Sequence, residues 1–349
     1  MPLRLLAAFA ALLAGPPLAL AAPPPTCPAQ HWTVAPPAES GWDAEKLGRL
    51  DTLLQSLDTA SLTVVHHGRI VFDYGSTSST YNLHSARKSI LSMLYGIAVG
   101  KGQAGLDATV GSLGIDDLGG LSDTEKTATV QQMLEARSCI YHEAVYETEA
   151  MKGKRPVRHS CSPGAQWYYN NWDFNALGTA YRIQTGKTVF EGFGDELAGP
   201  LQLEDFDPQR DTRFVGGHSS RHPAYTIRLS SHDFARLGLL MARGGDWCGR
   251  QLLPAGWVST STAPISPTDI AGVDYGYLWW TSAGNIHFGH RFASPVFSAR
   301  GHLGQYLLVV PADDLVVAHL SQGESDGHRL ASSSHFGQVV KAVIEAMPR

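Results

Sequence analysis

The chain has 349 residues, of which 17% are charged and 43% hydrophobic, so it is able to bury a sizeable core and is neither a disordered nor a collagen-like protein. Its 32 acidic and 27 basic residues give a formal net charge of −5, and no basic excess points to a nucleic-acid partner. The densest run of bases, Lys152, Lys154, Arg155 and Arg158, is short and is interpreted as a solvated loop.

The beginning of the chain has the pattern of an export signal. Arg4 precedes an apolar run at residues 5–14, and small residues at 19–21 stand just before three prolines at 23–25. The apolar run is too short to span a membrane and is followed by Gly15 and two prolines. We therefore expect a signal peptide at residues 1–21, a proline-rich lead at 22–42 and one domain at 43–349. The protein is expected to be secreted or periplasmic, with no membrane span.

Several elements follow from periodicity. Residues 43–57 have the apolar spacing of a helix, and residues 61–65 and 70–74 predict a β-hairpin with a turn between them. Helical segments separated by long polar loops extend from about 85 to 258. Strands are expected at 297–299, 305–310 and 315–320, and a last helix at 334–346.

Strands and a helix thus occur at both ends of the chain. The simplest packing is an α+β fold in which both ends build one antiparallel sheet, flanked by the terminal helices, with a large, mostly helical lobe inserted between them. Ligands commonly bind where two such lobes meet.

Four cysteines, Cys27, Cys139, Cys161 and Cys248, form no C-x-x-C pair, so zinc-ribbon and thioredoxin-like chemistry have no support. An even number in an oxidising compartment favours disulfides, although four cysteines allow three connectivities. We expect a bridge between Cys139 and Cys161 because the segment between them is polar and loop-like, and we leave the pairing of the other two open. No metal or other cofactor is predicted.

The first chemical motif is Ser85-Ala86-Arg87-Lys88, which opens an apolar helical stretch at residues 90–99. Positions i and i+3 share one face of a helix, so the Lys88 amine is able to approach the Ser85 hydroxyl. A desolvated lysine with a lowered pKa is able to take the serine proton, and the helix N-terminus favours developing negative charge. Alone, this four-residue pattern is common by chance, and an ordinary exposed lysine is the simpler interpretation.

A second motif lies in residues 167–172, where Tyr169 offers a phenolic proton shuttle and Asn171 a polarising amide. An aromatic core segment is the alternative interpretation. Trp167 and Trp280 are candidates for lining a substrate cleft, with a core position equally possible for Trp280.

The third motif is His302-Leu303-Gly304-Gln305, at the start of a strand. Gly304 would let a substrate approach the backbone closely. The Gln305 N–H would then complete an oxyanion hole with the Ser85 N–H.

These three motifs, in this order, resemble those of the serine β-lactamase and penicillin-binding protein superfamily over nearly all of the mature chain. The sequence is most similar to the class C-like group, which includes esterases, D-aminopeptidases and 6-aminohexanoate-dimer hydrolases. The resemblance implies the β-lactamase/transpeptidase-like fold and a serine hydrolase that forms an acyl-enzyme with an ester, amide or peptide substrate.

The resemblance also implies roles for individual residues. Ser85 would be the nucleophile, Lys88 its activating partner and Tyr169 a general base and acid. Asn171 would hold Lys88 and the substrate carbonyl. The third motif departs from the Lys-Thr-Gly of many relatives because His302 and Leu303 stand in the first two positions. This strand is therefore not expected to recognise a substrate carboxylate as those relatives do.

Other function classes have less support. No G-x-S-x-G elbow of an α/β-hydrolase occurs, and the 15 histidines form no H-E-x-x-H pattern of a metal hydrolase. Two alternatives stay open. One is a β-lactamase or D,D-peptidase acting on β-lactams or cell-wall peptides. The other is a non-catalytic binding or sensor module, which would be favoured if the three motifs lay apart in space.

Overall fold

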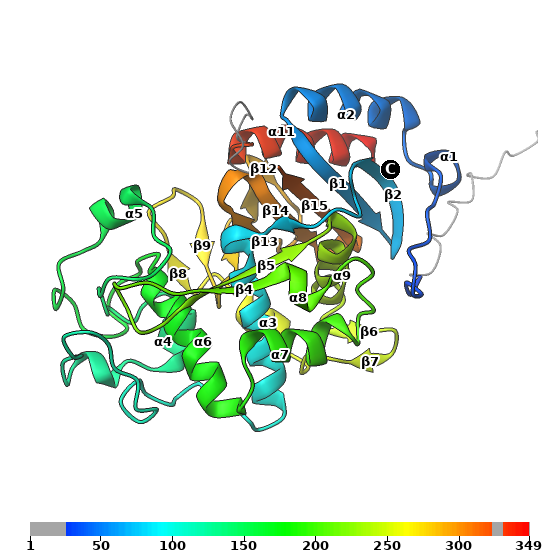
Figure 1. The fold of residues 1–349 in the computed structure, drawn as a ribbon. Coiled ribbons are helices and arrows are strands. Elements are labelled where there is room, and N and C mark those ends of the chain that lie inside the picture. Colours follow the sequence, from blue (N-terminus) through cyan, green and yellow to red (C-terminus); the bar gives the residue numbers. More distant parts are fainter. Residues whose placement is uncertain (1–25, 323–330, 349) are drawn as a thin grey trace, which may run out of the picture.

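The computed structural model describes residues 26–322 and 331–348, so the signal peptide expected at 1–21 lies outside the described residues. An eight-stranded antiparallel sheet forms the centre of the molecule, in the order β2-β1-β15-β14-β13-β10-β9-β8 (Figure 1). Its strands are β1 (Thr59–His66), β2 (Arg69–Gly75), β8 (Ser266–Pro267), β9 (Asp274–Tyr275), β10 (Trp280–Thr281), β13 (Phe297–Gly301), β14 (Gln305–Val310) and β15 (Leu315–Ser321).

The two ends of the chain meet inside this sheet. Strand β1 pairs with β15 from Thr59 opposite Ser321 to His66 opposite Leu315. The expected α+β architecture, with one sheet from both chain ends, is therefore confirmed. Strands β8, β9 and β10 were not predicted from the sequence, because each is two residues long and too short to show an alternating pattern.

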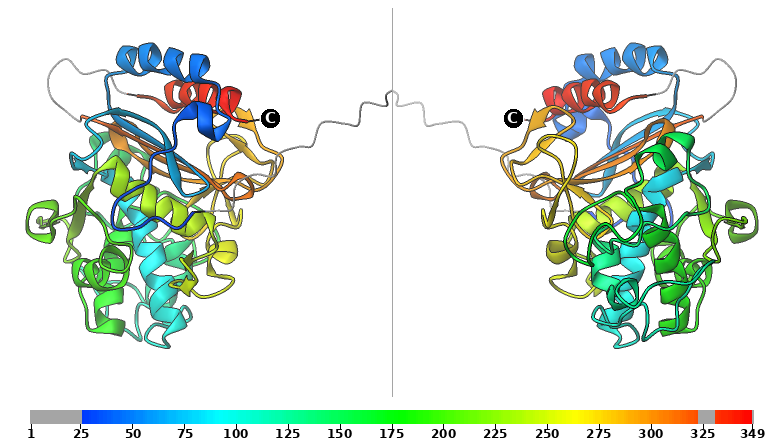
Figure 2. Two further views of the ribbon diagram at one scale, coloured as in Figure 1. Left: turned by 90° about the vertical axis from the view of Figure 1, so that its right-hand side faces the viewer. Right: turned by 90° about the vertical axis from the view of Figure 1, so that its left-hand side faces the viewer.

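The terminal helices lie side by side on one face of the sheet (Figure 2). They are α2 (Ala44–Ser56) and α11 (Ser333–Ala346), and helix α9 (Ser231–Ala242) covers the opposite face. Strand β14 shows why both faces are buried, since Leu308 packs in the core under the terminal helices and its neighbour Leu307 packs in the core on the other side. Alternate residues of a strand point to opposite faces, so a continuous apolar run satisfies both cores.

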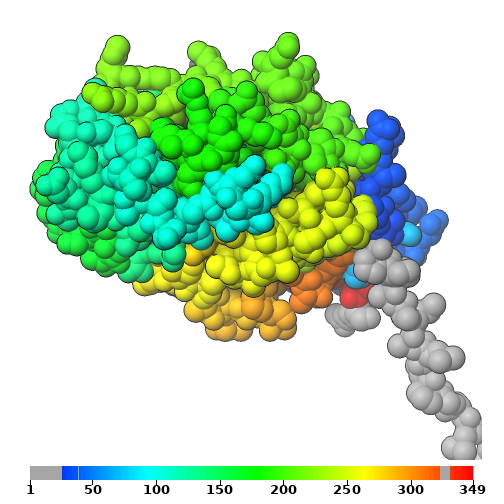
Figure 3. Space-filling view, turned by 90° about the horizontal axis from the view of Figure 1, so that it is seen from below, coloured from blue at the N-terminus to red at the C-terminus, as the bar shows by residue number. Residues whose placement is uncertain are grey.

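The middle of the chain forms the second lobe, which makes up most of the surface seen from below (Figure 3). Its helices are α3 (Arg87–Gly100), α4 (Val130–Leu134), α5 (Glu149–Lys154), α6 (Asn171–Thr185), α7 (Val189–Phe193), α8 (Pro208–Asp211) and α10 (Trp257–Ser261), and the short α1 (Pro37–Ser40) precedes α2. Short 3₁₀ and π segments are η1 (His84–Ala86), η2 (Glu125–Thr127), η3 (Gly194–Ala198), η4 (His302–Gly304) and η5 (Pro311–Asp313).

The lobe also contains strands that the sequence analysis did not predict. A three-stranded sheet in the order β3-β5-β4 joins β3 (Tyr81–Asn82), β5 (Ala224–Leu229) and β4 (Thr212–Val215). A small hairpin in the lobe is formed by β6 (Asp246–Trp247) with β7 (Arg250–Gln251). A second hairpin, β11 (Ile286–His287) with β12 (His290–Arg291), lies outside the lobe, beside helix α11 (Figure 1). Asn82 in β3 pairs with β5 and comes three residues before Ser85. The three-stranded sheet therefore holds the segment of chain that leads into the first motif.

Two disulfides connect distant parts of the chain. Cys139 is bonded to Cys161, which is the pairing expected from the sequence, and Cys27 is bonded to Cys248, which the sequence had left open. Among residues 26–322 and 331–348, no helix is both long and apolar enough to cross a membrane.

Candidate active site

Ser85 lies in the single 3₁₀ turn η1 that leads directly into α3. The preceding residue, His84, has a left-handed backbone with φ of 46°, and its N–H donates to the Asn82 side-chain oxygen at 3.1 Å. Such a conformation is costly for a residue with a side chain and persists only where the surroundings hold it. The turn therefore presents Ser85 at the N-terminal end of a 14-residue helix, where the backbone N–H groups favour negative charge.

Lys88 connects the first two motifs. Its Nζ lies 2.8 Å from Ser85 Oγ and 2.9 Å from Tyr169 Oη. The side chain is buried, and burial, with a further contribution from the neighbouring Arg87, holds the pKa of Lys88 well below its usual value. Burial therefore favours the neutral form of the Lys88 amine, which is able to accept a proton.

Tyr169 is enclosed by aromatic rings. Trp280 stacks on it with a ring-centre distance of 5.6 Å and an angle of 19°, and Phe174 meets it edge-on at 4.9 Å. Burial raises the pKa of Tyr169 to about 12, against smaller lowering effects of Ser85 and Arg87. The phenol therefore keeps its proton at neutral pH, so that a resting phenolate is not the base.

Trp167 and Trp280, which the sequence predicts to line a substrate cleft, lie behind Tyr169. Both pack against the lobe's hydrophobic core, and their rings contact each other at 6.4 Å beside Tyr169. Neither is among the described residues that line the cleft beside Ser85. They act as a rigid backing for Tyr169, which a sequence pattern alone does not distinguish from a cleft wall.

The third motif reaches Ser85 through a close backbone contact. Strand β13 ends at Gly301, where a Cβ atom would lie 2.2 Å from the Leu83 carbonyl oxygen and 3.2 Å from the Ala86 nitrogen. His302 and Gln305 line the same cleft as Ser85. The three motifs thus converge in space, which argues against a module in which they serve no common purpose.

Gly304, which was expected to let a substrate approach the backbone, packs against Ala331. It has a φ of 97°, and a Cβ there would lie 2.7 Å from the Ala331 Cβ and 2.9 Å from the Ala331 oxygen. The space beside Gly304 is therefore filled by the chain itself and not by a substrate.

Asn171 also differs from the expectation. Its side-chain amide donates to the Met151 sulfur at 3.2 Å, whereas the Lys88 amine contacts Ser85 and Tyr169. Asn171 still lines the cleft, at the first residue of α6, so its amide is close to any bound molecule. The methionine was invisible to motif reasoning because it lies 20 residues upstream on another helix.

The cleft beside Ser85 has a volume of about 730 Å³. Helix α5, strand β3 and strand β5 supply walls that the sequence analysis did not assign. The described residues that line it are Tyr81, Asn82, His84, Ser85, Arg87, Lys88, Tyr146, Glu147, Thr148, Ala150, Met151, Lys154, Asn171, Arg228, His302, Gln305, Ser321 and Gln322.

Two of these residues could have been suspected from their position in the first motif. His84 and Arg87 flank Ser85, and Arg87 is buried, donates to the His84 carbonyl at 2.6 Å and lies over the Tyr225 ring at 4.9 Å. Burial first, and then the nearby His302, Arg87 and Lys88, lower the pKa of His84 to about 4. His84 is therefore neutral at pH 7.

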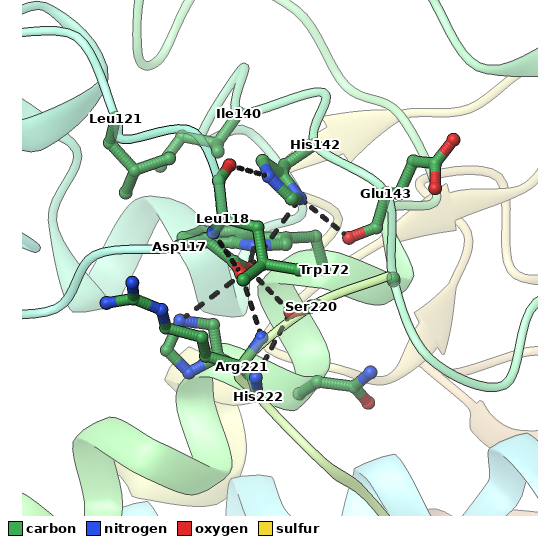
Figure 4. Close-up of polar contacts among 12 residues, drawn as sticks. Asp117, Leu118, Leu121, Ile140, His142, Glu143, Trp172, Ser220, Arg221 and His222 are labelled. Carbon is green, nitrogen blue, oxygen red and sulfur yellow. Dashed lines mark hydrogen bonds and ion pairs between the residues drawn. The ribbon is translucent and has the colours of Figure 1, made fainter. Parts of the chain in front are cut away.

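A buried carboxylate supports the second motif from behind. Asp117 accepts hydrogen bonds from Trp172 Nε1 at 2.7 Å, Ser220 Oγ at 2.5 Å and the N–H groups of Arg221 and Leu118 (Figure 4). Trp172 is the residue after Asn171, so this network fixes the start of α6. Among the described residues, no group of three or more His, Cys, Asp or Glu side chains is arranged to hold a metal ion.

Comparisons with known proteins agree with this geometry. A profile of the beta-lactamase family matches residues 49–336. The chain belongs to the beta-lactamase family. No curated protein matches the sequence of this beta-lactamase-family protein.

Solved structures show the fold shared by this family. A Bacillus anthracis protein assigned as a 6-aminohexanoate-dimer hydrolase has a TM-score of 0.65 at 18% identity, over 93% of this chain and 90% of its own. A penicillin-binding protein homologue from Caulobacter crescentus has a TM-score of 0.63 at 15% identity, over 88% and 99%. A class C beta-lactamase has a TM-score of 0.63 at 13% identity, over 86% and 95%. The expected β-lactamase/transpeptidase-like fold is thus confirmed.

Proposed function

We propose that the protein is a serine hydrolase that cleaves esters or amides through an acyl-enzyme on Ser85. The observation that carries the proposal is the buried Lys88 amine, which lies within hydrogen-bond distance of both Ser85 and Tyr169. Three groups in this arrangement provide a nucleophile, a base and a proton carrier.

In the first half of the reaction, the neutral Lys88 amine accepts the Ser85 proton while Oγ attacks the substrate carbonyl carbon. The carbonyl oxygen becomes an oxyanion, which the Ser85 and Gln305 N–H groups would stabilise. As the bond to the leaving group breaks, Tyr169 donates its proton to that group and recovers one from the Lys88 ammonium. The raised pKa of Tyr169 suits it to this role, since the phenol is protonated when the step begins.

In the second half, a water molecule attacks the acyl-enzyme. The Lys88 amine, directly or through Tyr169, removes a proton from the water, and the Ser85 oxygen is reprotonated as it leaves. The product acid is released and the resting state is restored, so that no group outside the chain and water is needed.

The third motif favours substrates other than conventional β-lactams. His302 replaces the lysine found in many relatives, so this strand presents no permanent cation to a carboxylate beside the scissile amide. Esters or open-chain amides fit this strand better. We further propose that the enzyme works outside the cytoplasm, a location in which its two disulfides persist.

Labelling with an uncharged fluorophosphonate tests the proposal. Intact-mass measurement should show a single adduct, which is lost in Ser85→Ala. Ser89 lies one turn further along α3 and donates to the Leu278 carbonyl at 2.7 Å, so Ser89→Ala is the matched control and should still be labelled. Labelling that survives in Ser85→Ala contradicts the assignment.

A further inference from the structure

The cleft beside Ser85 has an excess of positive charge. Among its described lining residues, Glu147 is the only acidic one, and it is already bound to Arg155 and to the Ala144 N–H. Arg87 lies at the base of the cleft and bonds to the His84 carbonyl. A molecule that enters therefore meets cations whose charge the cleft itself does not balance.

One of these cations belongs to the basic run that the sequence analysis interpreted as a solvated loop. Three of its four members have carboxylate partners: Lys152 with Glu149, Arg155 with Glu147 and Arg158 with Glu125. Lys154 has no ion pair with any described residue and lines the cleft. The Lys154 ammonium is thus free to bind an anion.

The position of Lys154 is fixed by its helix. Met151 and Lys154 are three residues apart in α5 and both line the cleft, as expected for one face of a helix. The Tyr168 hydroxyl donates to the Met151 carbonyl at 3.2 Å, and Met151 contacts Asn171. A substrate that reaches Asn171 therefore passes along Met151 toward Lys154.

The second cation, Arg228, comes from strand β5. Its Nη2 donates to the Thr80 carbonyl, and its Nε lies 3.8 Å from Asp211 Oδ1. Asp211 also accepts two hydrogen bonds from Arg210, at 2.7 and 3.1 Å. Asp211 is thus bound more closely by Arg210 than by Arg228, so Arg228 has only a long ion pair at the rim of the cleft.

We propose that Lys154 and Arg228 select substrates that carry a carboxylate remote from the scissile bond, such as half-esters or half-amides of dicarboxylic acids. This inference rests on the proposed serine hydrolase function and names its substrate class. Carboxylate recognition is thereby assigned to α5 and β5 and not to the strand that follows His302. An arginine already held by Thr80 and a flexible lysine together suit a mobile carboxylate, because a charge-assisted hydrogen bond is stronger than a neutral one.

The test compares kcat/KM for mono-4-nitrophenyl esters of succinate, glutarate and adipate with that for the uncharged 4-nitrophenyl butyrate and valerate. The wild type should prefer the anionic esters at low salt, and added salt should reduce the preference. Lys154→Gln and Arg228→Gln should each lower the ratio of anionic to neutral turnover about three- to tenfold, and Lys154→Glu should lower it further. A variant that folds poorly loses turnover of the neutral and anionic esters alike, so the ratio changes only when the anionic ester is bound less well.

Lys152→Gln is the matched control, because Lys152 lies on the same helix, is paired with Glu149 and does not line the cleft. The ratio of kcat/KM for the anionic ester to that for the neutral ester should be the same in Lys152→Gln as in the wild type.

A second pair of substrates, 4-acetoxybenzoate and its methyl ester, places the carboxylate on the leaving group. A drop in the variants' ratio for either pair supports the inference and shows which side of the scissile bond faces α5.

The outcomes separate the two proposals. If Ser85 is labelled normally but Lys154→Gln and Arg228→Gln leave both ratios unchanged, the carboxylate inference is wrong and the hydrolase function stands. If Ser85 is not labelled by the uncharged fluorophosphonate, both are wrong.

Discussion

The backbone of Gly301 packs against that of Leu83 so closely that any side chain at Gly301 would overlap the Leu83 carbonyl oxygen, at 2.2 Å from its Cβ. This contact joins the end of β13 to the turn that carries Ser85. It sets the separation between Ser85 and Gln305, whose N–H groups are proposed to bind the oxyanion. Leu83 and Gly301 thus lie just outside the two motifs that their contact brings together.

Gly301→Ala should therefore reduce acylation. The added methyl group forces β13 away from the Ser85 turn, and misplacing one oxyanion donor costs about 10²- to 10³-fold in kcat. Gly48→Ala is the control, since no atom lies within 4 Å of a Cβ built at Gly48 in α2. The rate of fluorophosphonate labelling measures acylation in both variants; it should fall in Gly301→Ala and stay at the wild-type value in Gly48→Ala. A Gly301→Ala enzyme that labels at the wild-type rate would show that the contact does not set the site.

The dependence on pH should report the Lys88 amine. Because its pKa is lowered and the neutral amine is the proposed base, kcat/KM should fall as pH decreases through that lowered pKa. Toward alkaline pH the rate should hold until Tyr169, with a pKa of about 12, loses its proton. Lys88→Arg, whose guanidinium stays charged, should lose about 10³-fold or more at every pH.

Lys88 and Tyr169 should also act as one unit. Lys88→Ala and Tyr169→Phe should each cost several orders of magnitude in kcat, and the double variant much less than the product of the two losses. Single-turnover kinetics with a 4-nitrophenyl ester measures all three. Losses that multiply would argue against a shared proton path.

The Asp117 network predicts a pH-dependent stability. Burial raises the pKa of Asp117, but the hydrogen bonds from Ser220, Arg221, Trp172 and Leu118 outweigh it and the pKa is lowered. A carboxylate with a lowered pKa in the folded state contributes stability above its unfolded pKa and loses it as pH falls through the folded pKa. Asp117→Asn should therefore cost about 2–4 kcal/mol at pH 7, and less as the pH falls through the lowered pKa of Asp117.

Urea unfolding at several pH values measures this difference. The exposed Asp123, changed to Asn, provides the control and should alter stability by less than about 0.5 kcal/mol. An Asp117→Asn penalty that is independent of pH would mean that the network does not depend on the charge of the carboxylate.

The Cys139–Cys161 disulfide should support binding as well as stability. It closes a loop with a sequence separation of 22 that contains α5 and the cleft residues from Tyr146 to Lys154. Replacing both cysteines by alanine should cost about 3 kcal/mol. It should also raise KM about tenfold, because the wall of the cleft is loosened.

The other disulfide distinguishes these two effects. Cys27 and Cys248 do not line the cleft, so replacing both should lower the melting temperature and leave KM near its wild-type value. Equal KM values in both double variants would contradict a role of the Cys139–Cys161 bridge in binding.

The third motif predicts slow turnover of β-lactams such as nitrocefin. Arg300 is held by the Ser298 hydroxyl at 3.0 Å and lies over the rings of Trp280 and Phe288, so it does not replace the cation missing at His302. His302→Lys should raise kcat/KM for nitrocefin about tenfold relative to an uncharged ester, through one charge-assisted hydrogen bond. Arg300→Ala should affect both substrates alike. Efficient wild-type turnover of nitrocefin would contradict this interpretation.

The sequence predicted those features that depend on neighbours along the chain. The approach of Lys88 to Ser85 follows from helical spacing, and the strand at 305–310 follows from the apolar run at 306–310. Met151 and Lys154 could not be predicted in this way, because their positions in the cleft depend on how α5 packs against α6. The same limit explains Gly304, whose neighbour Ala331 belongs to the segment before the last helix, and Trp280, which lies behind Tyr169.

The pairing of β1 with β15 has a consequence for when the enzyme becomes active. Ser85 follows the first strands of the sheet, but Gln305 and the strand that closes it come more than 200 residues later in the chain. Contacts between segments so distant in sequence require a large loop to close, and folds dominated by such contacts form slowly. A chain made only as far as Ser85 lacks Gln305, so in the proposed mechanism the two oxyanion-binding amides come together only once β14 and β15 have joined the sheet.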